Sequence, residues 1–139
     1  MQQGTKIEER FFQLIQVAVG KKVDAMFDLV DDEWLSIYKM ASEQSILGLV
    51  LQAADILSGK GLKPPMSLLY QWIGEGEQIR QQNHRVDQQC EQLSSWFKQK
   101  ELSSCVIKGQ GVARLYPQPD LRQPGDIDIW VDGKRDEIV

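Results

Sequence analysis

Apolar residues recur at steps of three and four along the first hundred positions, which is the spacing of one face of an α-helix. A first amphipathic helix is predicted to end at Gly20, a second to be capped by Asp31 and Asp32, and a third to end at Gly59 with Gly61. Each of these helices has one apolar face. The pattern therefore predicts that they pack against one another.

A fourth, much longer helix is predicted from Pro64-Pro65, a usual helix opening, to about residue 100. Its apolar seam runs through Leu69, Trp72, Gly76, Ile79, Asn83, Val86, Cys90, Leu93 and Phe97. Gly76 and Asn83 interrupt the apolar stripe, which allows two interpretations. They let another backbone approach or fix the register against a partner helix, or they belong to ordinary packing against the first three helices.

After Lys100 the pattern changes to short runs typical of strands and turns. A strand is predicted at 103–107, helical spacing follows at 109–116, three prolines mark a loop, and a second strand is predicted at 127–131. The predicted fold class is α+β. It has a mostly helical region of about four helices at 1–100, followed at 101–139 by the start of an α/β sheet with the order strand, helix, strand. This sheet looks incomplete.

Composition restricts the function more than it restricts the fold. With 26% charged and 42% hydrophobic residues, the 139-residue chain has the balance of a soluble globular protein. Because no run approaches the roughly 20 apolar residues that span a bilayer, and the start does not resemble a signal peptide, we expect a cytoplasmic protein without membrane contact. A net charge of -4 argues against nonspecific nucleic-acid binding.

The two cysteines and the single histidine carry no predicted chemistry. Cys90 and Cys105 have neither a disulfide pattern nor metal-ligand spacing, so we expect buried or idle thiols. His84 lies among polar neighbours of the long helix and is expected at the surface. Ile129 and Trp130 alternate along the second strand, so one of them should pack on the helical region.

Asp126-Ile127-Asp128 places two carboxylates one residue apart, so that in a strand both project from the same face. Such a pair can bind Mg²⁺ or Mn²⁺, and the ion then bridges the phosphates of a nucleotide. A lone Asp-x-Asp motif is common on solvated strand faces. The interpretation therefore depends on what accompanies the motif.

Upstream of this motif, the segment from Lys108 to Gly111 lies where a strand is predicted to turn into a helix. Gly109, Gln110 and Gly111 there would bring the backbone close to a phosphate at a helix N-terminus, and Lys108 adds a cation. Arg122 could hold a phosphate with both arms of its guanidinium. The alternatives are a glycine that only ends a strand, a solvated lysine, and an arginine paired with Asp120 or Asp126.

The run from Val106 to Ala113, Leu115-Tyr116-Pro117, Leu121-Arg122 and the run from Gly125 to Val131 together resemble the uncharacterised nucleotidyltransferase family of bacteria. This family is a branch of the polymerase-beta-like nucleotidyltransferase superfamily. The resemblance implies a nucleotidyltransferase-type sheet with a phosphate-binding turn. It also implies transfer of a nucleoside monophosphate from a nucleoside triphosphate to a hydroxyl acceptor.

By this resemblance, Asp126 and Asp128 are the catalytic residues and metal ligands for Mg²⁺ or Mn²⁺. Gly109 matches the glycine of the phosphate turn, and Arg122 the arginine that precedes the acidic motif. Gln110 stands where many members of the superfamily have Ser or Gly, and Gly125 where many have Ser. These departures remove two hydroxyl contacts to phosphate and put nucleotide affinity in doubt.

The superfamily also needs a third carboxylate from a later strand, and the chain ends at Val139. We therefore expect a fragment or truncated relative, inactive or incomplete as an enzyme, which could form a homo-oligomer through an open sheet edge or the long helix. Two alternatives are a non-catalytic helical interaction module with a degenerate nucleotidyltransferase segment, and a toxin-antitoxin component that modifies a protein. The sequence does not identify the base or the acceptor.

Overall fold

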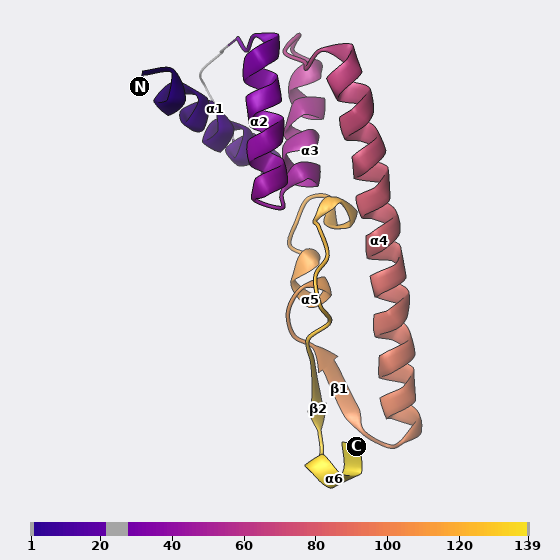
Figure 1. The fold of residues 1–139 in the computed structure, drawn as a ribbon. Coiled ribbons are helices and arrows are strands. Elements are labelled where there is room, and N and C mark those ends of the chain that lie inside the picture. Colours follow the sequence, from indigo (N-terminus) through magenta and orange to yellow (C-terminus); the bar gives the residue numbers. More distant parts are fainter. Residues whose placement is uncertain (1, 22–27, 139) are drawn as a thin grey trace.

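The computed structural model describes residues 2–21 and 28–138. Its helices are α1 (Gln2–Ala18), α2 (Asp31–Glu43), α3 (Leu47–Ser58), α4 (Met66–Gln99), α5 (Gln110–Ala113) and α6 (Arg135–Ile138), with a short 3-10 helix η1 (Pro119–Leu121). Figure 1 shows that α4 runs the length of the molecule, beside α3 at its N-terminal half and beside the strands at its C-terminal half, with α2 and α1 beyond α3. Within the described residues, no helix has the length and apolar character needed to cross a membrane.

The core of the molecule lies where α1, α2, α3 and the first half of α4 meet. Trp34, Trp72, Leu14, Ile37 and Val50 are all 0% exposed. The indole Nε1 of Trp72 donates a hydrogen bond of 2.8 Å to the carbonyl of Leu47 at the start of α3. Apolar burial of this extent supplies most of the stabilisation of a small domain, and it accounts for the predicted packing of the helices on one another.

The start of α2 differs in detail from the prediction. Its N-cap is Val30, whose N–H donates to the Glu33 carboxylate at 3.1 Å. Asp31 and Asp32 lie within the first turn and do not cap it. Acidic residues stabilise this position as well, because the N-terminal end of a helix carries a partial positive charge.

The two strands, β1 (Ser103–Val106) and β2 (Ile129–Asp132), form a two-stranded antiparallel sheet in which Val106 is opposite Ile129. The pairing extends one step further, since the Ile107 N–H donates to the Asp128 carbonyl at 3.0 Å. The predicted first strand is thus confirmed. The second begins two residues later than predicted, and the predicted helix at 109–116 contracts to the four residues of α5.

The sheet has one face toward α4 and one face toward solvent. Ile127 lines a hollow with Leu93 and Trp96 of α4. Ile129 is half-buried, whereas Trp130 is 55% exposed. It is therefore Ile129, and not Trp130, that lies on the side of the helical region. Together the bundle and the sheet confirm the α+β class.

The loop that carries η1 is clamped between α3 and α4, and the two interruptions of the α4 seam take part. A Cβ on Gly76 would lie 2.7 Å from the Leu51 side chain of α3, so this glycine serves ordinary packing against the first helices. Asn83 is 2% exposed, and its Nδ2 donates to the carbonyls of Asp120 and Arg122, each at 2.7 Å. Asn83 thus holds a loop of its own chain in place.

Candidate active site

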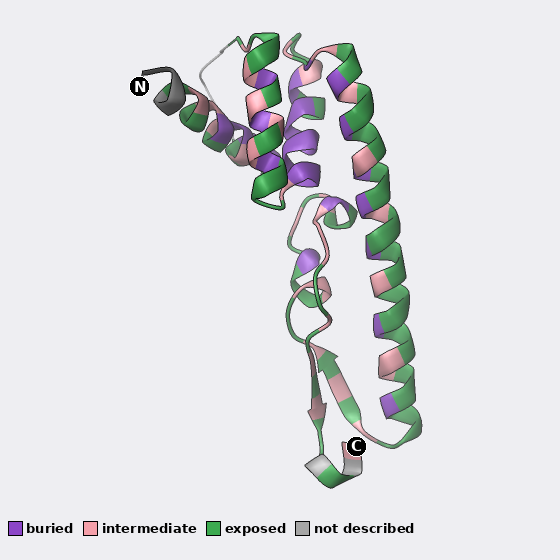
Figure 2. Cartoon of the chain, viewed as in Figure 1, coloured by how far each residue is buried: buried purple, intermediate pink, exposed green. Residues whose placement is uncertain are grey.

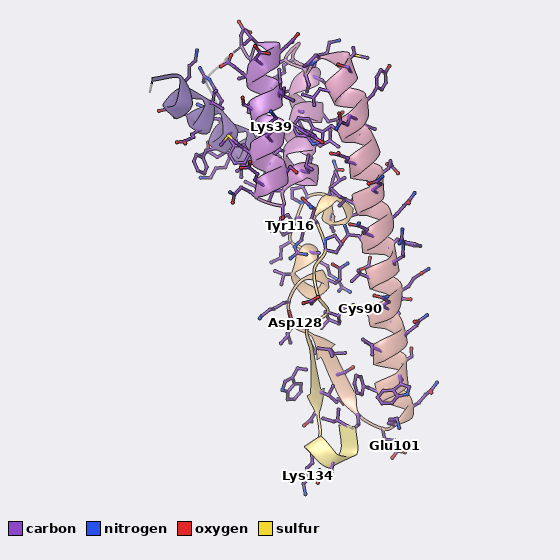
Figure 3. All side chains as sticks on the ribbon, viewed as in Figure 1. Lys39, Cys90, Glu101, Tyr116, Asp128 and Lys134 are labelled. Carbon is purple, nitrogen blue, oxygen red and sulfur yellow. The ribbon has the colours of Figure 1, made fainter. Side chains whose placement is uncertain are left out.

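The two carboxylates of the acidic motif lie in the extended segment that leads into β2. Asp126 and Asp128 are exposed, whereas Ile127 between them is half-buried on the α4 side. Figure 3 labels Asp128 at the start of this strand, with Cys90 on the neighbouring part of α4. Because side chains alternate along an extended chain, Asp126 and Asp128 share the outward face of the sheet.

The glycine turn lies beside this motif. Gly109 adopts φ 50° and ψ -106°, a backbone conformation that residues with a side chain rarely adopt. A Cβ at Gly109 would lie 3.6 Å from the carbonyl oxygen of Asp126. The fold thus brings the turn beside the main chain of the acidic motif, although the two are far apart in the sequence.

The close approach of two main-chain segments explains why the second glycine of the turn, Gly111, is a glycine. A Cβ on Gly111 would overlap the carbonyl oxygen of Val106, so only glycine allows the chain to turn back this closely onto the end of β1. Inside the turn, the N–H of Gly111 donates to Lys108 and the N–H of Val112 to Gly109. The N–H groups of Gly109 and Gln110 come before Gly111, the first residue whose N–H donates within the turn. At the start of a helix, such N–H groups are where an anion binds.

The Gln110 side chain faces away from this turn. Its Nε2 donates to the Asp87 carboxylate at 2.6 Å and to Asn83 Oδ1 at 3.3 Å, both on α4. A shorter Ser or Gly could not make this bridge, which gives the departure at this position a physical reason. Any contact of Gln110 with a phosphate would come from its main chain.

The two predicted cations lie in different surroundings. Lys108 is exposed. The guanidinium of Arg122 lies over the Tyr116 ring at a cation–π distance, 5.9 Å from its carbon to the ring centroid. Asp120, considered above as a partner of Arg122, forms its ion pair with Arg80 of α4 at 3.2 Å.

The remaining titratable groups near the sheet do not extend the site. Burial, and then the nearby Asp87 carboxylate, raises the pKa of the Cys90 thiol, so Cys90 remains a neutral thiol. Cys105 is exposed on the outward face, and neither cysteine forms a disulfide. His84 lies at the surface, as predicted. Over 2–21 and 28–138, no group of three or more His, Cys, Asp or Glu residues is placed to hold a metal ion.

A groove of about 870 Å³ separates α4 from β1, α5 and η1, and it was not predicted from the sequence. Asp87 and Glu91 line it from α4, and Gln110, Arg114 and Asp120 line it from the opposite wall. Asp126 and Asp128 do not line it. Its residues come from segments that have no common motif, so only the fold brings them together.

The site thus consists of a glycine turn close to the main chain of an Asp-x-Asp segment, at the end of a small sheet that packs on a long helix. Residues 31–137, well over half of the chain, match the model of the family described as Uncharacterised nucleotidyltransferase. The chain belongs to this family, which confirms the resemblance seen in the sequence. No curated protein and no solved structure matches the chain.

Proposed function

We propose that this chain supplies the triphosphate- and metal-binding face of an enzyme that transfers a nucleoside monophosphate from a nucleoside triphosphate to a hydroxyl acceptor. Family membership points to nucleotidyl transfer in general. The metal, the site residues and the role of each are part of the proposal.

One observation carries the proposal, namely the juxtaposition of the Gly109 turn and the Asp126 main chain. In a solvated strand face with an unrelated turn, nothing would require the turn to lie beside the acidic motif. Here the antiparallel pairing of β1 and β2 brings the two together, and Gly111 fits where no other residue would. A triphosphate held by the turn would therefore extend along the carboxylates.

The donor set suits a divalent cation. Asp126 and Asp128 offer hard oxygen ligands, and Mg²⁺ in proteins often takes only one or two carboxylates and completes its shell with phosphate oxygens and water. When bound, such an ion neutralises charge that develops on the phosphates during transfer. The main-chain N–H groups of Gly109 and Gln110 would bind the terminal phosphates, with Lys108 as a mobile cation beside them.

Arg122 has a different part in this scheme. Its guanidinium lies over the Tyr116 ring and its Nη1 donates to the Gln123 carbonyl at 3.4 Å, so both contacts restrict where the charge sits. From there Arg122 would neutralise the leaving pyrophosphate, or a phosphate group that stays bound to the turn. The acceptor hydroxyl oxygen would form a bond to the α-phosphorus and lose its proton to water, while the bond from the α-phosphorus to the α–β bridging oxygen breaks and pyrophosphate leaves with that oxygen.

The test is calorimetric titration with Mg²⁺ and inorganic tripolyphosphate, which has phosphates but no base. Replacing both carboxylates, Asp126→Asn with Asp128→Asn, is expected to weaken binding by at least about tenfold, because the ion loses its protein ligands. Asp132→Asn is the control for the single variants Asp126→Asn and Asp128→Asn, because it removes one carboxylate from the same face of β2, two positions beyond Trp130.

The comparison between these variants decides the matter. Loss of binding in the double variant with retention in Asp132→Asn supports the proposed site. If Asp132→Asn weakened tripolyphosphate binding as much as the variants of the acidic motif do, the general negative charge of the face would be responsible and not the motif. Tripolyphosphate binding that is independent of Mg²⁺, or that persists in the double variant, would refute the proposal.

A further inference from the structure

An exposed tryptophan continues the row of carboxylates on the outward face of the sheet. Trp130 follows Asp128 by two residues, so both project from the same face, and its side chain is 55% exposed. Directly opposite it on β1 lies Cys105, which is also exposed. Val106 pairs with Ile129 next along the ladder, and the step after that, on the same face as Trp130, joins Ile107 to Asp128. A flat apolar ring thus lies immediately beside the proposed metal site.

We propose that the base of the nucleoside triphosphate stacks on Trp130, so that this residue sets affinity for the nucleoside half of the substrate. The inference rests on the proposed function. Residues two apart on an extended strand are separated by about 6.6 to 6.8 Å. Asp126 beside the turn, Asp128 and then Trp130 therefore form a row whose order matches terminal phosphates, α-phosphate and base.

Charge distinguishes a nucleotide from an apolar protein segment as the occupant of this face. Trp130 has Asp128 before it and Asp132 after it on the same face of β2. An apolar segment laid over the ring would desolvate both carboxylates without neutralising them, which is costly. A metal-bound nucleotide neutralises Asp128 itself, and the polar edges of its base remain in water while its face covers the indole.

Stacking on an aromatic side chain tolerates every base, because each base has a π face. We therefore expect this contact to contribute to affinity without selecting strongly among nucleotides, with purines held somewhat more tightly because their rings are larger. The contact also covers the thiol opposite Trp130. Bound nucleotide should accordingly shield Cys105, whereas a ligand without a base should not.

The experiment compares Mg²⁺-ATP with Mg²⁺-tripolyphosphate on the full chain by calorimetry. Trp130→Ala is expected to weaken ATP about tenfold and to leave tripolyphosphate unchanged, because only the base loses its partner. Trp130→Phe retains an aromatic face and should restore most of the ATP affinity. Tyr70→Ala, which truncates a 67% exposed aromatic residue of α4 in the bundle half, should change neither ligand.

Alkylation of Cys105 by iodoacetamide gives a second readout in a Cys90→Ser background. ATP should slow the alkylation in the presence of Mg²⁺, and tripolyphosphate should not. Unchanged ATP affinity in Trp130→Ala would overturn the stacking proposal alone, provided that tripolyphosphate binding still depends on Asp126 and Asp128. Equal loss of both ligands, or a change of oligomeric mass in light scattering, would also overturn it in favour of a structural or protein-contact role.

Discussion

The two halves of α4 support two differently built regions. Its N-terminal half belongs to a bundle in which the largest side chains are fully buried, and Figure 2 shows buried residues concentrated on α3 and on the side of α4 that faces it. Its C-terminal half covers a two-stranded sheet whose outward face remains open, with Ile107 52% and Trp130 55% exposed. One helix thus joins a buried apolar core to a sheet face that is open to solvent.

The difference lies in what holds each region. The bundle depends on apolar contacts, whereas the loop before β2 depends on a polar clamp that includes Asn83, the Arg80–Asp120 ion pair, and Gln123, whose amide oxygen accepts from the Leu47 N–H at 3.1 Å. Regions with few buried apolar contacts open more readily than a core. We therefore expect the bundle to determine global stability and the clamp to determine the geometry of the site.

The largest expected effect comes from the bundle. Trp72→Ala removes a side chain that is 0% exposed and leaves the Leu47 carbonyl without its indole donor. We expect a loss of about 3 to 5 kcal/mol in the free energy of unfolding. Urea unfolding monitored by circular dichroism measures this loss.

Ile73→Ala is the control, because the adjacent Ile73 is 45% exposed, and it should reduce the free energy of unfolding far less. Equal losses in the two variants would show that burial is not decisive in this bundle.

A smaller and more local effect is expected at the clamp. A Cβ on Gly48 at the start of α3 would overlap the backbone carbonyl of Leu121, so Gly48→Ala should lift the loop from the bundle at a cost of about 1 to 3 kcal/mol. Gly74→Ala is the control, because a Cβ there meets nothing within 4 Å and alanine favours the helix.

Hydrogen exchange distinguishes the local effect from a global one. In Gly48→Ala, amides of residues 118–123 should exchange faster while those of α2 and α3 keep most of their protection, and tripolyphosphate should bind more weakly. Uniform loss of protection across the bundle would show that the clamp and the core form a single cooperative unit. That result would remove the distinction between the two regions.

Much of the helical part could be predicted because its signals are local. The three-and-four spacing and Pro64-Pro65 define α4, and Gly59 marks the end of α3, since these depend on neighbours within a few turns. The role of Asn83 could not be predicted. Its partners, the carbonyls of Asp120 and Arg122, come from a loop far along the chain, and an isolated polar residue in an apolar seam does not reveal which backbone it meets.

The sequence predicted only some of the residues of the candidate site that lie close together. Alternation along a strand was enough to place Asp126 and Asp128 on one face, but the antiparallel register that brings Gly109 to Asp126 is a long-range property. The turn of Gln110 toward Asp87 is likewise visible only in the fold. Trp130 was considered only as a packing residue, because an exposed aromatic residue on a strand looks the same in sequence as a buried one.

The smallest expected effect is a pH dependence that should belong to the bundle alone. Burial, and then the hydrogen bond to the Glu75 carboxylate at 2.6 Å, raises the pKa of Tyr38 from 10.0 to about 12. The folded state therefore holds the phenolic proton more tightly than the unfolded chain does. The resulting stabilisation is fully present below pH 10 and is lost as the pH rises through about 12.

Tyr38→Phe isolates this contribution, because it removes the titrating hydroxyl and keeps the ring that packs edge-on against Trp72 at 5.4 Å between centroids. Thermal midpoints measured from pH 9 to 12 should fall more steeply in the wild-type chain than in the variant, since other groups titrate equally in both. Parallel curves would refute the link. If the difference also appeared in hydrogen exchange at the sheet, the contact between α2 and α4 would stabilise the sheet as well as the bundle.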